Sequence, residues 1–226
     1  TGHSGTNLDD TLKFGPGINA SDITINRSGN DLIFTVSPSD QVTVKDWFVN
    51  SYQYIEKIQF SDTTTWDITK LKTLVPAVYN GASVAETING WDGIDNINGL
   101  AGNDTINGLA GNDIIDGGDN DDTIDAGDGN DQILGGLGAD KITGGNGDDV
   151  IDGGDGADTI TDTAGANTLK GGLGNDIISG RGTFEGGKGD DTISGKDTWS
   201  GDTYVFNLGD GKDTIADYGV SNATGH

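Results

Sequence analysis

The chain of 226 residues contains 40 Gly, 3 Pro, 37 Asp plus Glu and only 12 Lys plus Arg, so its formal net charge is -25. Hydrophobic residues make up 32% of it, too few for an ordinary core, and composition alone is typical of an acidic disordered chain. A charge of this size repels nucleic acid and anionic lipid, and it attracts hard cations that prefer oxygen ligands. The absence of Cys excludes disulfides, zinc–thiolate sites and thiol nucleophiles.

Neither a membrane span nor a secretion leader is indicated. No apolar run approaches the roughly 20 residues that cross a bilayer, and residues 1–12 lack the charged and apolar regions of a leader peptide. Both ends of the chain read Thr-Gly-His, which fits either an added tag or the seam between successive copies of one module. We therefore expect the chain to be a piece of a longer protein.

Residues 1–74 are poor in glycine and carry short runs in which apolar and polar residues alternate. Alternation of this kind, rich in β-branched and aromatic side chains, predicts strands. The runs lie at residues 22–25, 32–36, 41–44 and 55–60, with a hairpin turn expected at 28–31. We expect a small antiparallel β domain, followed by a connector over residues 75–89.

Four aromatic residues of this domain allow two interpretations. Burial is the commoner fate of such side chains, so we expect Trp47, Phe48, Phe60 and Trp66 to fill its small core. The alternative is an exposed aromatic platform that binds a ligand.

From Gly90 to Ser179 the sequence repeats every nine residues without a break, in the form G-G-x-G-x-D-x-U-x with U apolar. Strand alternation predicts a three-residue strand whose middle residue, at position eight, points inward. Two units would form one coil, and stacked coils would place each inward residue over the one 18 residues away, at about 4.8 Å. The inward positions are Ile97, Ile106, Ile115, Ile124, Ile133, Ile142, Ile151, Ile160, Leu169 and Ile178.

The turns of these units combine glycine with aspartate. Glycines at positions one, two and four are expected to supply the positive φ of a tight turn, and Asn120, which replaces the glycine at position four, tolerates the same region. Position six is Asp in every unit but one, where Asn167 stands. Calcium is bound by six to eight hard oxygens, and stacked turns would offer both carboxylates and carbonyls. Without a cation between them, stacked carboxylates would repel each other strongly.

The nonapeptide resembles the calcium-binding repeat of RTX (repeats-in-toxin) proteins, and the resemblance covers Gly90 to Asp217. It implies an all-β fold, a calcium-bound parallel β-roll, in which the position-six Asp and the turn carbonyls bind one ion between successive coils. It also implies that the chain leaves the cell unfolded through a type I secretion channel and folds in external calcium. The expected calcium ligands are Asp95, Asp104, Asp113, Asp122, Asp131, Asp140, Asp149, Asp158, Asp176, Asp191 and Asp213.

The first region is similar to the haemolysin-type calcium-binding-related domain that accompanies such repeats. The likeness rests on Trp47 and Phe48 after the second hairpin, and on the run 55–60 before Trp66. Together the two resemblances imply a secreted protein at a bacterial cell surface.

Beyond the ten regular units the rhythm changes. Residues 180–185 and 195–200 are six-residue units, separated by a full unit at 186–194. Six residues allow a strand of three and a turn of three, so we expect Phe184 and Trp199 to take the inward position. Turns this short, without a position-six Asp, should hold no calcium.

The two edges of the roll are therefore expected to differ. One edge keeps a continuous Asp ladder up to Asp191, whereas the other meets Asn167 and the short turns. With one ion between each adjacent pair of Asp, the first edge would hold about five ions and the second about three, about eight in all. Residues 201–217, which include Tyr204, are expected to cap the roll, and residues 218–226 to form a tail.

The function indicated is structural: a calcium-rigidified module of a large secreted adhesin, surface-layer component or toxin, acting as a folding device and spacer. The alternative is binding of a ligand or host surface through residues 1–74. An enzyme is not expected, because the only His residues are His3 and His226, although a glycosidase built on two carboxylates stays conceivable. Position three lacks the Thr row with which some calcium-bound rolls bind ice.

Overall fold

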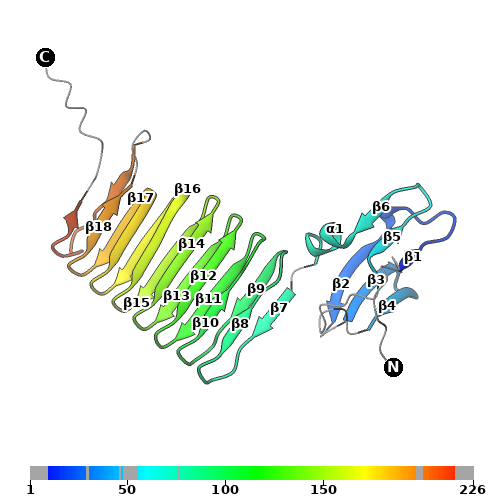
Figure 1. Ribbon diagram of the computed structural model, residues 1–226, viewed down its shortest axis with the longest axis horizontal. Helices are drawn as coiled ribbons and strands as arrows, with labels where there is room; N and C mark the ends of the chain where they lie inside the picture. The colour runs from blue at the N-terminus through cyan, green and yellow to red at the C-terminus, as the bar shows by residue number, and fades with distance from the viewer. Residues whose placement is uncertain are drawn as a thin grey trace, which may run out of the picture. The chain divides into compact units, whose positions relative to one another are not determined.

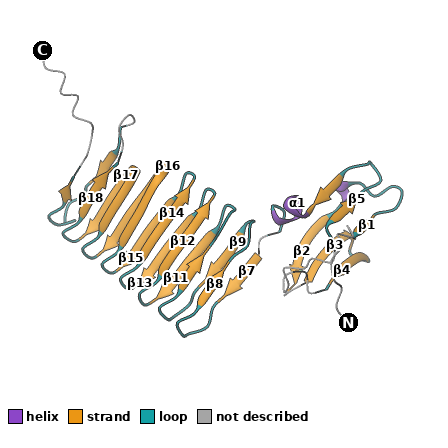
Figure 2. Cartoon of the chain, in the orientation of Figure 1, coloured by secondary structure: helices purple, strands orange, loops and turns teal. Residues whose placement is uncertain are grey.

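A computed structural model describes residues 10–28, 31–45, 47, 55–75, 77–196 and 201–216. The chain divides into two compact units, Thr1–Pro76 and Ala77–His226. The expected all-β class is confirmed, since strands are the main regular structure of both units in the described part (Figure 2). No helix among the described residues is long and apolar enough to cross a membrane.

The N-terminal unit contains two small sheets. The strands β2, β3 and β4 form an antiparallel sheet, as expected, while β5 pairs with β6 antiparallel and with β1 parallel. A 3-10 turn covers Ala20–Asp22 and a short helix, α1, covers Ile68–Lys72. The strands are β1 (Thr11–Lys13), β2 (Thr24–Ser28), β3 (Asp31–Ser37), β4 (Asp40–Val44), β5 (Lys57–Gln59) and β6 (Thr65–Asp67).

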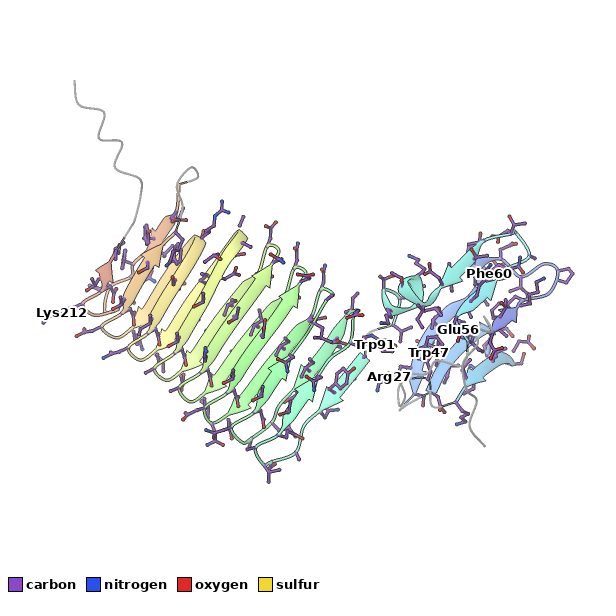
Figure 3. All side chains as sticks on the ribbon, in the orientation of Figure 1. Arg27, Trp47, Glu56, Phe60, Trp91 and Lys212 are labelled. Atoms are coloured by element: carbon purple, nitrogen blue, oxygen red, sulfur yellow. The ribbon has the colours of Figure 1, made fainter. Side chains whose placement is uncertain are left out.

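The aromatic side chains of this unit lie mainly in its core. Trp47 and Phe60, labelled in Figure 3, are each only 3% exposed. The Phe60 ring stacks on Phe14 and meets the half-buried Trp66 edge-on, with ring centroids 4.5 Å apart. Phe48 lies outside the described residues. The three described aromatics that we expected in the core therefore do not form an exposed platform.

The second unit is a parallel β-roll, in which strands from successive coils stack side by side (Figure 1). The strands β7, β9, β11, β13 and β15 lie on one face and β8, β10, β12 and β14 on the other, while the long β16 and β17 continue both. Up to β16 the strands are β7 (Ala77–Asn80), β8 (Thr87–Asn89), β9 (Asp95–Asn98), β10 (Thr105–Asn107), β11 (Ile114–Asp119), β12 (Thr123–Asp128), β13 (Gln132–Leu137), β14 (Lys141–Asn146), β15 (Val150–Asp155) and β16 (Thr159–Leu173). The others are β17 (Ile177–Lys188), β18 (Thr192–Gly195), β19 (Thr203–Val205) and β20 (Thr214–Ile215).

The core of the roll is the expected double row of aliphatic side chains. Ile106 pairs with Ile124 and Ile115 with Ile133, so each inward residue lies over the one 18 residues away. All ten position-eight side chains are buried, and they form one continuous cluster. The nine-residue period therefore predicted the register correctly through the regular part of the roll.

The strands are longer than expected. From β11 to β15 each strand has six residues, covering positions seven to nine of one unit and one to three of the next. In β11 both Ile115 and Gly117 are buried, so position one also points inward. The expected strand of three residues with one inward side chain is therefore too short, because the chain stays extended through the first residues of each expected turn.

The roll begins before the first regular unit. The segment 75–89, expected as a connector, contributes β7 and β8, which pair with β9 and β10. Ile88 is buried in the core cluster, and Tyr79 packs against it opposite Ile97. Residues 81–89 therefore act as a further coil segment with a degenerate turn.

At the other end of the roll the expected register is partly wrong. Phe184 is fully buried over Leu169, as expected. Its partner in the next coil, however, is Tyr204 of β19 and not Trp199, which lies outside the described residues. The Phe184 and Tyr204 rings stack with centroids 5.3 Å apart. The chain between β18 and β19 is therefore longer than the three-residue turn that we had assumed.

A row of outward threonines runs along one face of the roll. Thr87, Thr105 and Thr123 pair in register at position seven, and Thr159 and Thr192 continue the row. Our sequence reasoning considered position three alone and missed this row. Because Lys141 and Ile177 also stand in it, threonine does not form it without a break.

Candidate metal centres

The position-six aspartates form two hydrogen-bonded ladders along the edges of the roll. On one edge the Asp104 N–H donates to Asp122 Oδ1, and the Asp122 N–H donates to Asp140 Oδ1, both at 2.8 Å. The same bond links each ladder residue to the one in the next coil. The remaining rungs are Asp140 to Asp158, Asp158 to Asp176 and Asp176 to Asp191 on this edge, and Asp95 to Asp113, Asp113 to Asp131 and Asp131 to Asp149 on the other.

The second carboxylate oxygen of most of these residues has no partner. Each ladder Asp from Asp95 to Asp191 is at most 2% exposed, and from Asp104 onward one oxygen of each is buried without a hydrogen bond. A buried carboxylate oxygen without a donor is costly, so the ladders need a positive charge or a proton at these atoms. The unpartnered atoms are Oδ2 of Asp104, Asp113, Asp122, Asp131, Asp140, Asp149, Asp158, Asp176 and Asp191.

Most of the unpartnered oxygens face a carbonyl oxygen of the following coil, namely those of Asp104, Asp113, Asp122, Asp140, Asp158 and Asp176. A Cβ added to Gly135 would lie 2.5 Å from Asp140 Oδ2 and 2.4 Å from the Gly153 carbonyl oxygen. The same holds at Gly117, where Asp122 Oδ2 and the Gly135 carbonyl oxygen lie 2.6 and 2.5 Å from that point. Two acceptors that converge without a donor fit a hard cation.

This geometry corrects the role that we expected for the first glycine of each unit. Positions two and four adopt positive φ, for example 114° at Gly136 and 81° at Asn120, but position one does not. Glycine at position one, as at Gly135, leaves out a side chain that would strike the carboxylate and the carbonyl oxygen, although one unit carries Ala126 there. It therefore makes room for the oxygens and does not shape the turn.

Burial raises the pKa of the ladder carboxyls. The pKa of Asp113 is raised to about 7, chiefly by burial and also by the neighbouring Asp131 carboxylate, although the Asp95 N–H opposes the shift. Burial likewise raises the pKa of Asp122, Asp131, Asp140, Asp158 and Asp176 to about 6 in each case. In the absence of a cation the folded ladders therefore hold protons more tightly than free aspartate does.

Both ladders extend further than the regular units. On the edge that carries Asp104, the ladder begins where the Glu86 N–H donates to Asp104 Oδ1. The same edge ends where the Asp191 N–H donates to Asp213 Oδ1 at 3.1 Å. The other edge ends with the Gly182 N–H donating to Asp202 Oδ1. Asp213, one of the expected ligands, thus extends a ladder that we expected to end at Asp191, whereas Glu86 and Asp202 were missed because neither belongs to a regular unit.

One unit departs from the ladder pattern in two residues at once. Asn167 keeps the rung, since its Oδ1 accepts from the Asp149 N–H at 3.0 Å, but its Nδ2 donates to the Ala164 carbonyl. Position one of the same unit is Asp162, which is 1% exposed and whose Oδ2 has no hydrogen-bond partner. Its pKa is raised to about 7, chiefly by burial and also by Asp149. Sequence reasoning did not single out Asp162.

Carboxylates do not gather into larger groups in the part of the chain that the structure describes. No cluster of three or more His, Asp or Glu side chains is arranged there to hold a metal ion. Any ion in the roll would therefore depend on carboxylate oxygens from one or two residues together with backbone carbonyls.

Comparison with protein families supports the same conclusion. The RTX calcium-binding nonapeptide repeat matches in four copies, at residues 89–124, 125–160, 152–182 and 179–197. The chain is an RTX-repeat protein. Residues 31–70 match the haemolysin-type calcium binding protein related domain. Both resemblances seen in the sequence are confirmed, and no curated protein matches the chain.

RTX nonapeptide repeats bind calcium. In this chain, the atoms that fit the ion are the unpartnered Asp oxygens and the position-one carbonyls of the following coil. A bound cation would supply the positive charge that these facing acceptors lack. The protein holds the two oxygens in place through the ladder hydrogen bonds, and the glycines leave room for them because they have no side chain.

Proposed function

We propose that the roll is a structural module that folds when calcium binds between its coils. One observation carries the proposal: along both edges, buried carboxylate oxygens without hydrogen-bond partners face carbonyl oxygens of the next coil. Closing the roll without a cation would bury these acceptors against one another. Calcium accepts such a mixed set of carboxylate and carbonyl oxygens, whereas magnesium is smaller and keeps its waters.

The calcium ligands that we propose are the ladder carboxylates expected from the sequence. Each ion would lie between a carboxylate oxygen of one Asp and the position-one carbonyl of the following coil. The total is about eight ions, with one per adjacent pair of Asp. The proposed ligands are Asp95, Asp104, Asp113, Asp122, Asp131, Asp140, Asp149, Asp158, Asp176, Asp191 and Asp213.

A thin core makes folding depend on the metal. The regular part of the roll buries one aliphatic side chain per nine residues, and the chain carries a formal net charge of -25. Such a core contributes little against the repulsion and the entropy of ordering the chain. Metal binding then becomes part of the folding free energy.

The role that follows is a stiff spacer, and a device that delays folding until calcium is met. RTX-repeat proteins are typically secreted, and external calcium would be the signal to fold. We propose that the chain belongs to a larger secreted protein and that its roll separates or presents neighbouring parts. Binding of a host surface through residues 1–74 is the alternative, but the buried Trp47 and Phe60 give it no support.

Circular dichroism of the whole chain tests the proposal. We expect the β signal of the roll to be lost in chelator, restored by millimolar calcium and not restored by magnesium. Asp122→Asn should weaken calcium binding, whereas Asp121→Asn is a matched control at the neighbouring exposed position. An unchanged β signal in chelator would refute the proposal.

A further inference from the structure

The unit of residues 162–170 holds an exchange of residue types that the nonapeptide pattern does not explain. The other nine units carry Asp at position six, and at position one they carry glycine or, in the unit of residues 126–134, Ala126, whereas this unit carries Asn167 and Asp162. The number of carboxylates in the two positions is unchanged, but the carboxylate has moved by five residues along the chain. Asp162 belongs to β16, a strand labelled in Figure 1, and its carboxylate lies close to Asp149 of the same ladder.

Asp162 places its carboxylate where the other coils place a carbonyl oxygen. A Cβ added to Gly144 would lie 2.3 Å from Asp162 Oδ2 and 2.7 Å from Asp149 Oδ2. At Gly135 the corresponding neighbours are the Gly153 carbonyl oxygen and Asp140 Oδ2. The side chain of Asp162 therefore replaces a neutral carbonyl ligand with a charged one.

No donor group of another residue neutralises this pair of oxygens. Oδ2 of Asp162 and Oδ2 of Asp149 are both buried and unpartnered, and each residue is 1% exposed. The Asn167 amide could have offered a donor, but its Nδ2 donates to the Ala164 carbonyl at 2.8 Å instead. Two buried carboxylates side by side without a donor need either a cation or a shared proton between them, and a cation can reach both oxygens at once.

We propose that Asp149 and Asp162 hold a calcium ion of their own, so that the edge interrupted by Asn167 keeps a site where its ladder loses a charge. The inference rests on the calcium-dependent function proposed above. It changes the expectation for this edge, which had only about three ions because we assumed that Asn167 ended the sites. Two carboxylates balance both charges of a divalent cation, whereas the usual single carboxylate with a neutral carbonyl balances only one.

The test exchanges the two residues back and counts bound calcium. The full chain, the variant Asp162→Asn and the double variant Asp162→Gly/Asn167→Asp are loaded with calcium, and the ions per chain are counted by native mass spectrometry. We expect Asp162→Asn to bind one ion fewer than the parent and the double variant to bind the same number as the parent. Asp155→Asn, at an exposed position three, is the control and should keep the full number.

The outcomes separate this inference from the proposed function. If Asp162→Asn binds as many ions as the parent, Asp162 holds no calcium, and the pair shares a proton. If the double variant binds one ion more than the parent, the parent has no site here, and the inference is again wrong. The double variant restores the regular unit, so it gives an answer even if Asp162→Asn does not fold. A parent chain that binds no calcium would refute the proposed function itself.

Discussion

Acid should partly replace calcium in folding the roll. The perturbation is a drop in pH from about 7.5 to about 5 in a chain freed of calcium on a chelating resin. Burial raises the pKa of Asp113 and Asp162 to about 7 and that of Asp122, Asp140 and other ladder residues to about 6, from 3.8 in free aspartate. Between the free pKa and the raised pKa values the folded chain binds more protons than the unfolded chain. The stability of the folded chain therefore falls as the pH rises through this range.

The size of the effect follows from the number of protons. Each extra proton on the folded state changes the free energy of unfolding by about 1.4 kcal/mol per pH unit. An uptake of two protons would give about 3 kcal/mol per pH unit, a large part of the stability of an ordinary domain. This stability is complete below about pH 4 and is lost through about pH 6 to 7, where the raised pKa values lie.

Far-UV circular dichroism of the calcium-free chain measures the effect. We expect more β signal at about pH 5 than at about pH 7.5, and at pH 5 the chain stays above its isoelectric point of about 4.1. With calcium present the trend reverses, because protons compete with the ion for the carboxylates. Equal signals at the two pH values without calcium, or a signal that grows with pH, would refute the reasoning.

Three further predictions concern single residues. Asp140→Ala should lower calcium binding more than Asp95→Ala in calorimetric titration, because Asp140 lies between two ladder neighbours and Asp95 at one end; equal losses would contradict this. Phe184→Ala should lower the free energy of unfolding of the calcium-loaded chain by about 3–5 kcal/mol in denaturant titration, since the ring is fully buried, and a loss below about 1 kcal/mol would contradict its core position. Leu109→Gly should stabilise the chain by about 1 kcal/mol, because Leu109 has a φ of 80°, whereas Leu137→Gly at an ordinary φ should not.

The regular part of the fold could be predicted from the sequence because every copy of the repeated unit predicts the same strand and turn. Ile106 and Asp104, with their counterparts in every unit, lie where the period and strand alternation placed them. The site was less readable. That Gly135 makes room for two oxygens, and does not shape the turn, depends on how the coils stack, which no single unit reveals.

The irregular parts could not be predicted from the same period. Glu86 takes a ladder position in a segment without paired glycines, so that segment looked like a connector. Tyr204 takes the place expected for Trp199, because the length of the preceding loop is not fixed by any repeat. Asp162 was missed although the sequence held a signal: an Asp at position one and an Asn at position six of the same unit.

The aspartate ladders give the roll a direction. In every rung an N–H of one coil donates to the carboxylate of the next, so one end of a ladder leaves an acceptor and the other leaves a donor. Two such rolls could join end to end only head to tail, an arrangement that continues into open fibres instead of closing as a symmetric dimer. The aromatic contact of Phe184 with Tyr204 and the carboxylate of Asp213 cover the donor end. We therefore expect the closing of that end to hinder head-to-tail polymerisation of the chain.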